Sequence, residues 1–414
     1  MQDDVTGQGR ASAISPRIPG ARSETIRRSN LASILTSLHI AGPASRSELV
    51  ERTGLTRSAV GGLIGELTAR GLVSEARARP AGTPGRPSPV ASARGDENVV
   101  VGLEILVDTI AVAVVGLGGE IARIERAHRP RDVAPAERLV EELAAMVRPI
   151  LDGLRDSRRV HGVGAAVAGV VHRHDRRVIF GPNLGWHDVP LGDLLRDALD
   201  VSVPVVIGND GDLGALAERR RGAGRGVHDL VYLSGEVGIG GGIISGDHSI
   251  TGGSGFAGEV GHMHVNPDGL RCGCGAIGCW ETEAGEDALL RRAGLDPADG
   301  AVAVERLVAD VERGRATARA ALDEEGRWLG VGIASLVNLF SPERVVLGGF
   351  LHRIYRHVIE PLRIVLDEQA LAASRAQVEV VSAELGADAP VLGAAEAAWD
   401  SLLTDPGGVA PLGT

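Results

Sequence analysis

The chain has 414 residues, a net charge of −11, 44% hydrophobic residues and 23% charged residues. This length and composition are typical of a globular protein with two or three domains and a sizeable core. The sequence contains no apolar run long enough to span a membrane and no signal peptide at its start. We therefore expect a cytoplasmic protein that has no membrane partner.

Positive charge is concentrated near the N-terminus. Residues 1–95 contain 13 arginines and 7 acidic residues, and the rest of the chain carries a net charge of −17. A basic head on an acidic body suggests that nucleic acid meets the head alone. A generic basic tail would give the same charge, so charge by itself does not decide between the two.

The head has the element order of a winged helix-turn-helix, which we assign to residues 24–95 after a disordered polar tail at residues 1–23. Apolar spacing and capping residues carry this prediction. The expected elements are a helix from Thr25 to about Gly42, a short helix Arg46–Thr53 capped by Ser45, a helix capped by Thr56 and running to about Arg70, and a strand from Leu72.

Two groups of residues in the head suit DNA contacts. Arg57 and Ser58 begin the third helix, where a recognition helix meets base edges. Arg77, Arg79 and Arg86 lie in or after the wing, where they suit phosphate or minor-groove contacts. A three-helix module that binds protein is the alternative, but charge, turn spacing and wing together favour double-stranded DNA.

Residues 96–404 read as two similar α/β lobes around a cleft. The first lobe is expected at residues 96–208, completed by a C-terminal helix at about 390–404, and the second at residues 209–389. Antiparallel strands followed by parallel strand–helix units occur twice along this stretch. The expected strands are 99–105, 109–115, 120–128, 160–170, 203–207, 230–233, 242–244 and 344–347, with helices at about 135–154, from about 213, and near 320–339.

The three cysteines of the protein fall within eight residues, in the pattern Cys272-x-Cys274-x4-Cys279, and His262 precedes them by ten residues. Three thiolates and an imidazole are the donors of a closed tetrahedral zinc site, so we expect structural Zn²⁺ on these four residues. Buried apolar cysteines or a redox pair are the alternatives. A disulfide is disfavoured because Cys-x-Cys is a poor spacing for one.

These motifs resemble the ROK family of repressors, open reading frames and sugar kinases. The segment from Glu259-Val-Gly-His262 to Cys279-Trp-Glu281 is the most specific mark, and Gly181-Pro-Asn-Leu-Gly-Trp186 and Gly208-Asn-Asp210 match two more family motifs. The resemblance implies an actin-like (ribonuclease H-like) body, zinc ligands at the four residues above, and contacts with sugar hydroxyls. The sugar-binding positions that it implies are Asn183, Asn209, Asp210, Glu259, His262 and Glu281.

The resemblance also bears on catalysis. Family kinases hold nucleotide phosphates on an Asp-x-Gly-Gly-Thr turn and use the residue that matches Asp210 as general base. The matching turn here reads Glu104-Ile-Leu-Val-Asp108, and the second phosphate loop begins with Glu236-Val237 in place of glycine and threonine. Branched side chains and extra acids would keep phosphate away. We therefore expect a chain without kinase activity.

The sequence thus predicts a sugar-responsive transcription regulator, a repressor of carbohydrate genes that sugar in the cleft releases from its operator. A homodimer or homotetramer is implied by the family and by the fixed spacing of operator half-sites. An active sugar kinase with a regulatory head, an activator, and a regulator controlled by a protein partner stay open as alternatives. The sequence does not identify the sugar.

Overall fold

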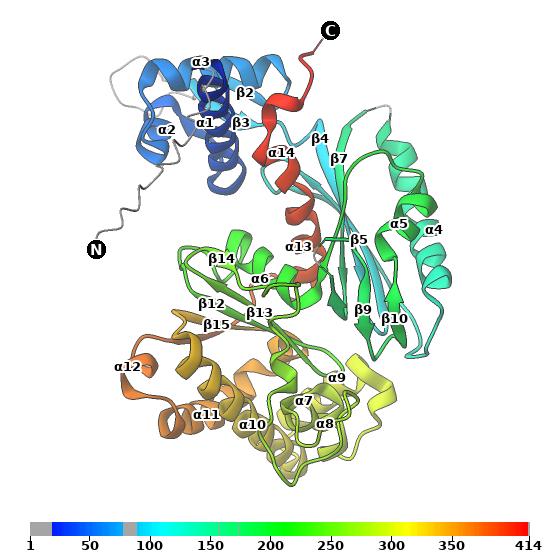
Figure 1. The fold of residues 1–414 in the computed structure, drawn as a ribbon. Helices are drawn as coiled ribbons and strands as arrows, with labels where there is room; N and C mark the ends of the chain where they lie inside the picture. Colours follow the sequence, from blue (N-terminus) through cyan, green and yellow to red (C-terminus); the bar gives the residue numbers. More distant parts are fainter. Residues whose placement is uncertain (1–18, 78–88, 156, 173, 413–414) are drawn as a thin grey trace, which may run out of the picture.

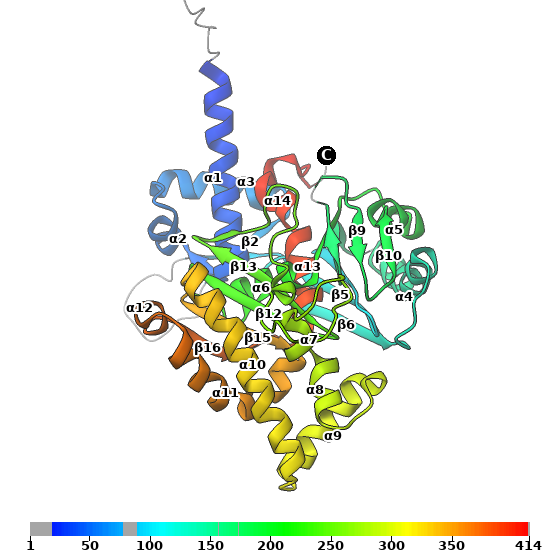
Figure 2. The same cartoon turned by 60° about the horizontal axis from the view of Figure 1, so that its bottom comes forward.

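The computed structural model describes residues 19–77, 89–155, 157–172 and 174–412. The chain forms an N-terminal unit of helices with a small sheet, and a body of two α/β lobes (Figures 1 and 2). The C-terminal helices run between the N-terminal unit and the body (Figure 1). None of the described helices is both long and apolar enough to cross a membrane.

The N-terminal unit contains the three predicted helices, α1 (Pro19–Ala41), α2 (Arg46–Thr53) and α3 (Arg57–Ala69). Ser45 and Glu48 form a reciprocal capping box at the start of α2, and the Thr56 hydroxyl accepts the Ala59 N–H at the start of α3. The turn between them needs Gly54, whose φ of 69° lies in the left-handed region. The two capping predictions are confirmed.

Two expectations for this unit need correction or fall outside the structure. Helix α1 begins at Pro19, so the expected disordered tail at residues 1–23 is too long, because its last residues continue the helix. The wing is a sheet in the order β1-β3-β2, made of β1 (Ala44–Ser45), β3 (Pro89–Ala93) and β2 (Val73–Arg77). Arg79 and Arg86 lie outside the described residues.

The two lobes share one topology. In the first, the sheet order is β11-β7-β4-β5-β6, with β4, β5 and β6 antiparallel and β4, β7 and β11 parallel. In the second, the order β14-β13-β12-β15-β16 repeats the same pattern from the antiparallel hairpin to the parallel strands. The prediction of two similar α/β lobes is therefore confirmed.

The elements of the lobes have the following bounds. The first lobe contains β4 (Asn98–Ile105), β5 (Thr109–Gly116), β6 (Ile121–His128), α4 (Ala136–Arg155), β7 (Arg159–Val167), β8 (Val170–Val171), β9 (Val178–Gly181), β10 (Trp186–Val189), α5 (Leu191–Leu199) and β11 (Val205–Asn209). The second contains α6 (Asp210–Arg221), β12 (Leu230–Gly235), β13 (Ile239–Ser245), β14 (His248–Ser249), η1 (Val260–His262), α7 (Trp280–Ala284), α8 (Glu286–Arg292), η2 (Pro297–Asp299), α9 (Gly300–Glu312), α10 (Ala316–Phe340), β15 (Arg344–Gly349), α11 (Phe350–Gln369), α12 (Ala372–Arg375) and β16 (Glu379–Ser382).

The C-terminal helix α13 (Ala389–Ala398), which follows the short turn η3 (Gly386–Asp388), packs directly on the first sheet. A Cβ on Gly164 of β7 would lie 1.9 Å from the Ala394 carbonyl oxygen, so only glycine allows this approach. Helix α14 (Asp400–Thr404) and the turn η4 (Pro406–Gly408) then reach the N-terminal unit. The fully buried Trp399 belongs to one hydrophobic cluster with residues of α1, α3 and β5. The head therefore shares a core with the body and is not suspended on a linker.

Candidate functional site

A cavity of about 640 Å³ lies between the two lobes, and all six predicted sugar-binding residues line it. Asn183 comes from the β9–β10 turn, Asn209 from the end of β11, and Asp210 from the start of α6. The second lobe contributes Glu259 and His262 beside η1 and Glu281 from α7. Residues that are distant in the sequence thus surround one space between the lobes.

The side chain of Asn209 forms its hydrogen bonds with backbone groups of the protein. Its Oδ1 accepts the backbone N–H groups of Gly211 at 2.8 Å and Asp212 at 3.2 Å, and its Nδ2 donates to the Gly169 carbonyl at 3.1 Å. Asn209 is therefore the N-cap of α6, which explains why this helix begins at Asp210 and not near residue 213 as expected. The cap places the next side chain, Asp210, against the cavity.

Several carboxyl groups line the cavity. Asp210 is buried, and burial raises its pKa to about 7, while a neighbouring backbone N–H lowers it and the charge of Glu259 raises it. Burial likewise raises the pKa of Glu259, which His262 opposes and Glu281 reinforces. Such groups accept hydrogen bonds when ionised and can also donate when protonated, which suits a polyol.

Glu236 is a fourth acid of the cavity, whereas the sequence pattern indicates only a change in a phosphate loop at this position. It stands in the β12–β13 turn and lines the ligand cavity and also a second cavity behind it. Burial raises its pKa well above the ordinary range, and the negative charge of Asp210 adds to this effect. An acid in a glycine-rich turn was the available signal, and it should have been taken as a candidate ligand.

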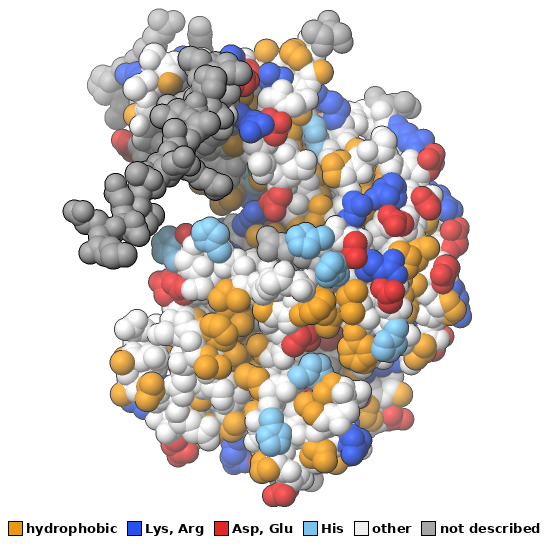
Figure 3. All heavy atoms as spheres, in the orientation of Figure 1, with side chains coloured by type: hydrophobic (Ala, Val, Ile, Leu, Met, Phe, Trp, Pro, Cys, Tyr) orange, Lys and Arg blue, Asp and Glu red, His pale blue; other side chains and the backbone are white. Residues whose placement is uncertain are grey.

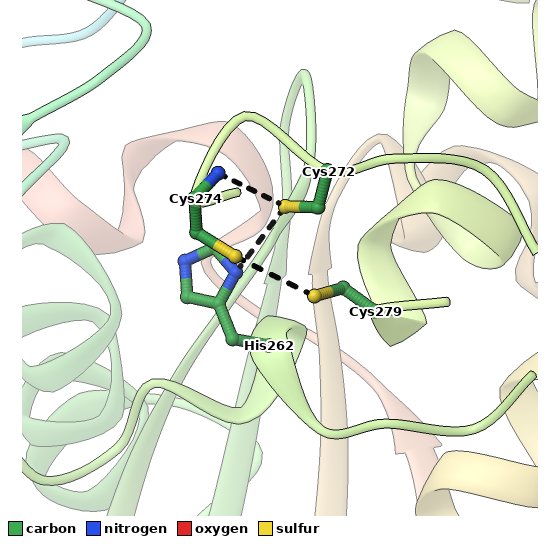
Figure 4. Close-up of side chains that lie close together, drawn as sticks. All are labelled: His262, Cys272, Cys274 and Cys279. Atoms are coloured by element: carbon green, nitrogen blue, oxygen red, sulfur yellow. Dashed lines mark hydrogen bonds between the residues drawn. The ribbon is translucent and has the colours of Figure 1, made fainter. Parts of the chain in front are cut away.

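His262, Cys272, Cys274 and Cys279 meet in one cluster (Figure 4), where their donor atoms all lie within 4.8 Å of one another. The Cys272 Sγ lies 3.6 Å from His262 Nδ1, and the Cys274 Sγ lies 3.6 Å from the Cys279 Sγ. Zn–S bonds of about 2.3 Å in a tetrahedron place sulfurs about 3.8 Å apart. The spacing and the donor set therefore fit a tetrahedral metal site.

The cluster adjoins the ligand cavity through His262. Its Nδ1 faces the thiols, while its Nε2 lies 3.9 Å from Glu259 Oε2. Glu281 Oε1 accepts from the Cys272 thiol at 2.8 Å and lies 3.5 Å from His262 Nδ1. A metal in the cluster would fix His262 directly and Glu281 through Cys279, which directly precedes α7. The Cys272 thiol would lose its proton to the metal and would no longer donate to Glu281.

The second cavity, of about 610 Å³, lies on the other side of Glu236, and Glu104, Asp108 and Glu286 also line it. Arg131 crosses from the first lobe, where its Nε donates to Asp108 at 3.0 Å, to the second lobe, where it pairs with Glu286 and lies 3.3 Å from Asp287. The expected phosphate turns therefore hold an ionic cluster that joins the lobes.

The start of α3 is open to solvent. Arg57 and Ser58 are exposed, and a Cβ added to Gly62 or Gly65 would meet no atom within 4 Å. Arg77 ends strand β2 in the wing. The surface of the body is different from that of the head. On the face of the first lobe that Figure 3 shows, acidic and basic side chains are interspersed. On that face the lobe offers no broad basic surface, which agrees with the charge asymmetry of the sequence.

The comparisons with known proteins divide the chain in the same way. The MarR family profile matches residues 32–86, and the ROK family profile matches residues 100–400. The xylose repressor of Bacillus subtilis is 28% identical over 380 residues, which are 91% of this chain and 97% of the repressor. The glucokinase of Streptomyces coelicolor is 32% identical over 317 residues, which are 72% of this chain and 97% of the kinase.

A solved structure has the same overall fold. It is a ROK family transcriptional regulator described as a homologue of the Escherichia coli MLC protein, and the two chains share 24% identity with a TM-score of 0.74. The match covers 92% of this chain and 98% of that one, which includes head and body. Because the profile also spans nearly the whole body, the chain belongs to the ROK family and joins its actin-like body to a MarR-type winged helix.

Proposed function

We propose that the protein is a sugar-responsive transcription regulator, a repressor that leaves its operator when sugar fills the interlobe cavity. The observation that carries this proposal is one cavity lined by Asn183, Asp210, Glu259, His262 and Glu281, in a chain whose N-terminal unit presents the open end of α3. Carboxylate and amide groups in such a set recognise hydroxyls by paired hydrogen bonds. The repressor relative, which matches head and body together, supports the same function.

The metal cluster is proposed to hold structural Zn²⁺ on His262, Cys272, Cys274 and Cys279. Three sulfurs and one imidazole nitrogen fill four positions, which leaves none open for a reacting water. When bound, the ion supplies a fixed link between the loop 263–279 and the cavity. The chain's own contribution is to orient His262 Nε2 and the Glu281 carboxylate toward a ligand.

The regulator would not transfer phosphate. Nucleotide phosphates need backbone N–H groups and cations that approach them closely. Instead, Glu104 of β4 and Asp108 of the turn that follows line the second cavity, together with Glu236 and Glu286. Arg131 is already engaged with three of the neighbouring carboxylates. Arg126 and Arg353 also line this space, but both are paired with carboxylates, so neither is free for a phosphate.

A sugar kinase remains the second candidate because of Asp210. Its carboxyl is buried at the cavity and its pKa is raised to about 7, a value suited to a general base near neutral pH. The glucokinase relative matches the whole body. Steady ATP consumption that depends on a sugar and is abolished in Asp210→Asn would establish the kinase and displace the repressor as the main function.

The proposed output is a change in the spacing of two heads. A ligand that binds better to the closed lobes shifts the population toward closure. In a homodimer or homotetramer, lobe closure would move the paired α3 helices away from the separation of two operator half-sites. Sugar would then weaken operator binding without touching the head.

The test is fluorescence anisotropy of the protein on DNA from its own upstream region, at fixed salt, with and without each sugar of a panel. Salt is fixed because phosphate contacts make the affinity strongly dependent on it. We expect tight binding that one sugar releases, and a loss of at least tenfold in affinity for Arg57→Ala. Arg363→Ala, an exposed arginine of α11, is the matched control. Operator affinity that no sugar alters would contradict the proposal.

A further inference from the structure

A third cavity, of about 620 Å³, adjoins the ligand cavity. The two share Asn183, Val237, Gly238 and Glu281 in their walls. At the junction a Cβ on Gly238 would lie 2.2 Å from Glu281 Oε2, so glycine is what allows the carboxylate to stand between them. Most residues that line the third cavity do not line the first. A single sugar ring held against Asp210 would therefore leave the third cavity unfilled.

The walls of the third cavity differ from those of the first. Leu270 and Arg271 come from the loop that carries the cysteines, Thr282 from α7, and Asp287 and Arg291 from α8. Leu270 is 57% exposed, although it is a large apolar side chain beside the ligand cavity. Arg291 is exposed, and its charge acts on Asp287, one turn earlier in α8 and in the same cavity wall. The cavity thus combines an exposed apolar side chain with an exposed donor.

This combination favours a neutral ring over an anion. Glu281 and Asp287 lie in the same walls as the two arginines, so a phosphate would be repelled as well as attracted. Arg271 Nη1 already donates to the Gly275 carbonyl at 2.9 Å. A sugar ring has hydroxyls that accept from arginine and donate to carboxylate, and a C–H face that can lie on an aliphatic side chain.

We propose that the third cavity is a second sugar subsite and that the effector is a disaccharide, with one ring against Asp210 and the other over Leu270 and Arg291. This inference rests on the proposed sugar-binding function and gives its ligand class. Glu281 stands at the junction and is placed to accept from hydroxyls of both rings. Lobe closure would then depend on a ligand that spans the groove, so a monosaccharide would be a weaker effector.

Isothermal titration calorimetry of the full chain tests the subsite. The probes are glucose, xylose and N-acetylglucosamine, together with maltose, cellobiose, xylobiose and diacetylchitobiose. We expect one disaccharide to bind at least tenfold more tightly than its own monosaccharide. Arg291→Ala should weaken that disaccharide at least fivefold and leave the monosaccharide within twofold. Arg319→Ala, whose ion pair lies on the surface of α10, is the matched control and should change neither affinity.

Three outcomes would overturn the subsite. No disaccharide of the panel binds more tightly than its monosaccharide, or Arg291→Ala weakens both ligands equally. In the third, glucose 6-phosphate binds more tightly than glucose and loses that advantage in Arg291→Ala, which would make the cavity an anion site. In each case a monosaccharide still binds, and the proposed regulator stands. If no sugar binds at all, the regulator fails first and the subsite with it.

Discussion

Glu104 shows what burial does to a single side chain in the cleft. It is fully buried in β4, and one oxygen lies 3.4 Å from Arg126. Its other oxygen, Oε1, has no hydrogen-bond partner among the described residues. Burial raises its pKa to about 7, which the charge of Arg126 partly offsets. The carboxyl is thus held near its titration point under physiological conditions.

This raised pKa predicts how stability depends on pH. Between the unfolded pKa of about 4.5 and the folded pKa of about 7, the folded protein binds more protons, so the free energy of unfolding falls as pH rises through this window. Asp210, with a pKa raised to about 7, and Glu325, raised to about 8, act in the same direction. Glu104→Gln should remove the contribution of Glu104 to this pH-dependent change in the free energy of unfolding. That contribution is on the order of 3 kcal/mol between pH 4.5 and pH 8.

Urea denaturation at several pH values from 5 to 8 gives the free energy of unfolding of wild type and of Glu104→Gln. The difference between the two proteins at each pH measures the contribution of Glu104. The partly buried His161, whose pKa is lowered to about 4, destabilises the fold as pH falls below 6.5, but it acts equally on both proteins and cancels. Glu360→Gln changes a carboxylate whose side chain is 75% exposed and serves as control. Parallel stability curves for wild type and Glu104→Gln would contradict the prediction.

The metal cluster gives a second prediction at this scale. Cys274→Ser should lower the bound zinc to well under one ion per chain and cost several kcal/mol, because binding of a structural zinc is coupled to folding of its loop. Sugar affinity should fall as well, since His262 and Glu281 lose their support. Metal analysis of freshly purified protein and thermal unfolding measure these effects. Met263→Leu, next to the cluster, is the control. Equal zinc content in wild type and Cys274→Ser would remove Cys274 from the ligand set.

Among the elements, α6 connects the cavity with the head. Its first residue, Asp210, faces the cavity, and its last, Arg221, donates through Nε to Glu396 of α13 at 2.8 Å and through Nη1 to the His39 carbonyl of α1 at 2.8 Å. His39 Nδ1 accepts the Gly118 N–H at 2.9 Å, and its Nε2 lies 3.1 Å from Glu396 Oε2 and 2.8 Å from Arg221 Nη2. A 12-residue helix spans about 18 Å, so one rigid element joins the two sites.

Arg221→Ala should therefore weaken the response of operator binding to sugar more than it weakens the binding of sugar itself. Sugar affinity should stay within twofold, while the sugar-induced change in operator affinity should shrink at least threefold. Stability should fall by about 2 kcal/mol, because the buried Glu396 keeps His39 and Arg220 but loses one partner. Fluorescence anisotropy with and without sugar measures the response, and urea denaturation measures the stability.

Arg219→Ala, from the same turn but paired with Asp247 of the second lobe, is the control. An unchanged response in Arg221→Ala would show that α6 does not couple the sites.

The elements of the head could be predicted from sequence because each has a local signal. Ser45 and Thr56 cap helices, and the apolar spacing of α3 matches the residues that are buried. The C-terminal helix expected at about 390–404 corresponds to α13 and α14, although α13 has no such periodicity, because all ten of its residues are buried. Helix α5 and the β9–β10 hairpin were missed for a different reason. They flank the Gly181–Trp186 motif, which was interpreted as ligand chemistry and not as a turn between strands.

In the candidate site, too, some residues could be predicted from local sequence patterns and others could not. The residues of the metal cluster and the acids beside it follow from spacing along the chain, and the resemblance to the family supplied Asn183 and Asp210. The contact of Arg131 with Glu286 joins residues that are 155 positions apart, and no local pattern predicts it. Glu236 lines two cavities because of how the lobes pack against each other, and this too has no local pattern in the sequence.

At the scale of the whole molecule, Arg131 is a direct link between the lobes. Its side chain is 16% exposed, and it pairs with Asp108 of the first lobe and with Glu286 and Asp287 of the second. Its Nη1 also donates to the Pro297 carbonyl at 3.0 Å. The protein thus holds its lobes together with a guanidinium at the position that family kinases are expected to give to a nucleotide. Under the proposed function, closure would then respond to sugar alone.

Arg131→Gln should loosen this closed arrangement. Glu286 is nearly fully buried and would lose its charged partner, so stability should fall by about 3 kcal/mol. A smaller population of closed molecules lowers the apparent affinity for a ligand that needs closure, so sugar binding should weaken at least fivefold. Small-angle scattering should show a larger radius of gyration without sugar and a return toward the wild-type value with sugar. Arg138→Gln, from a surface pair on α4, is the control. If Arg131→Gln bound sugar as tightly as wild type at an unchanged radius, the ionic cluster would be a structural remnant, and lobe closure would depend on the sugar cavity alone.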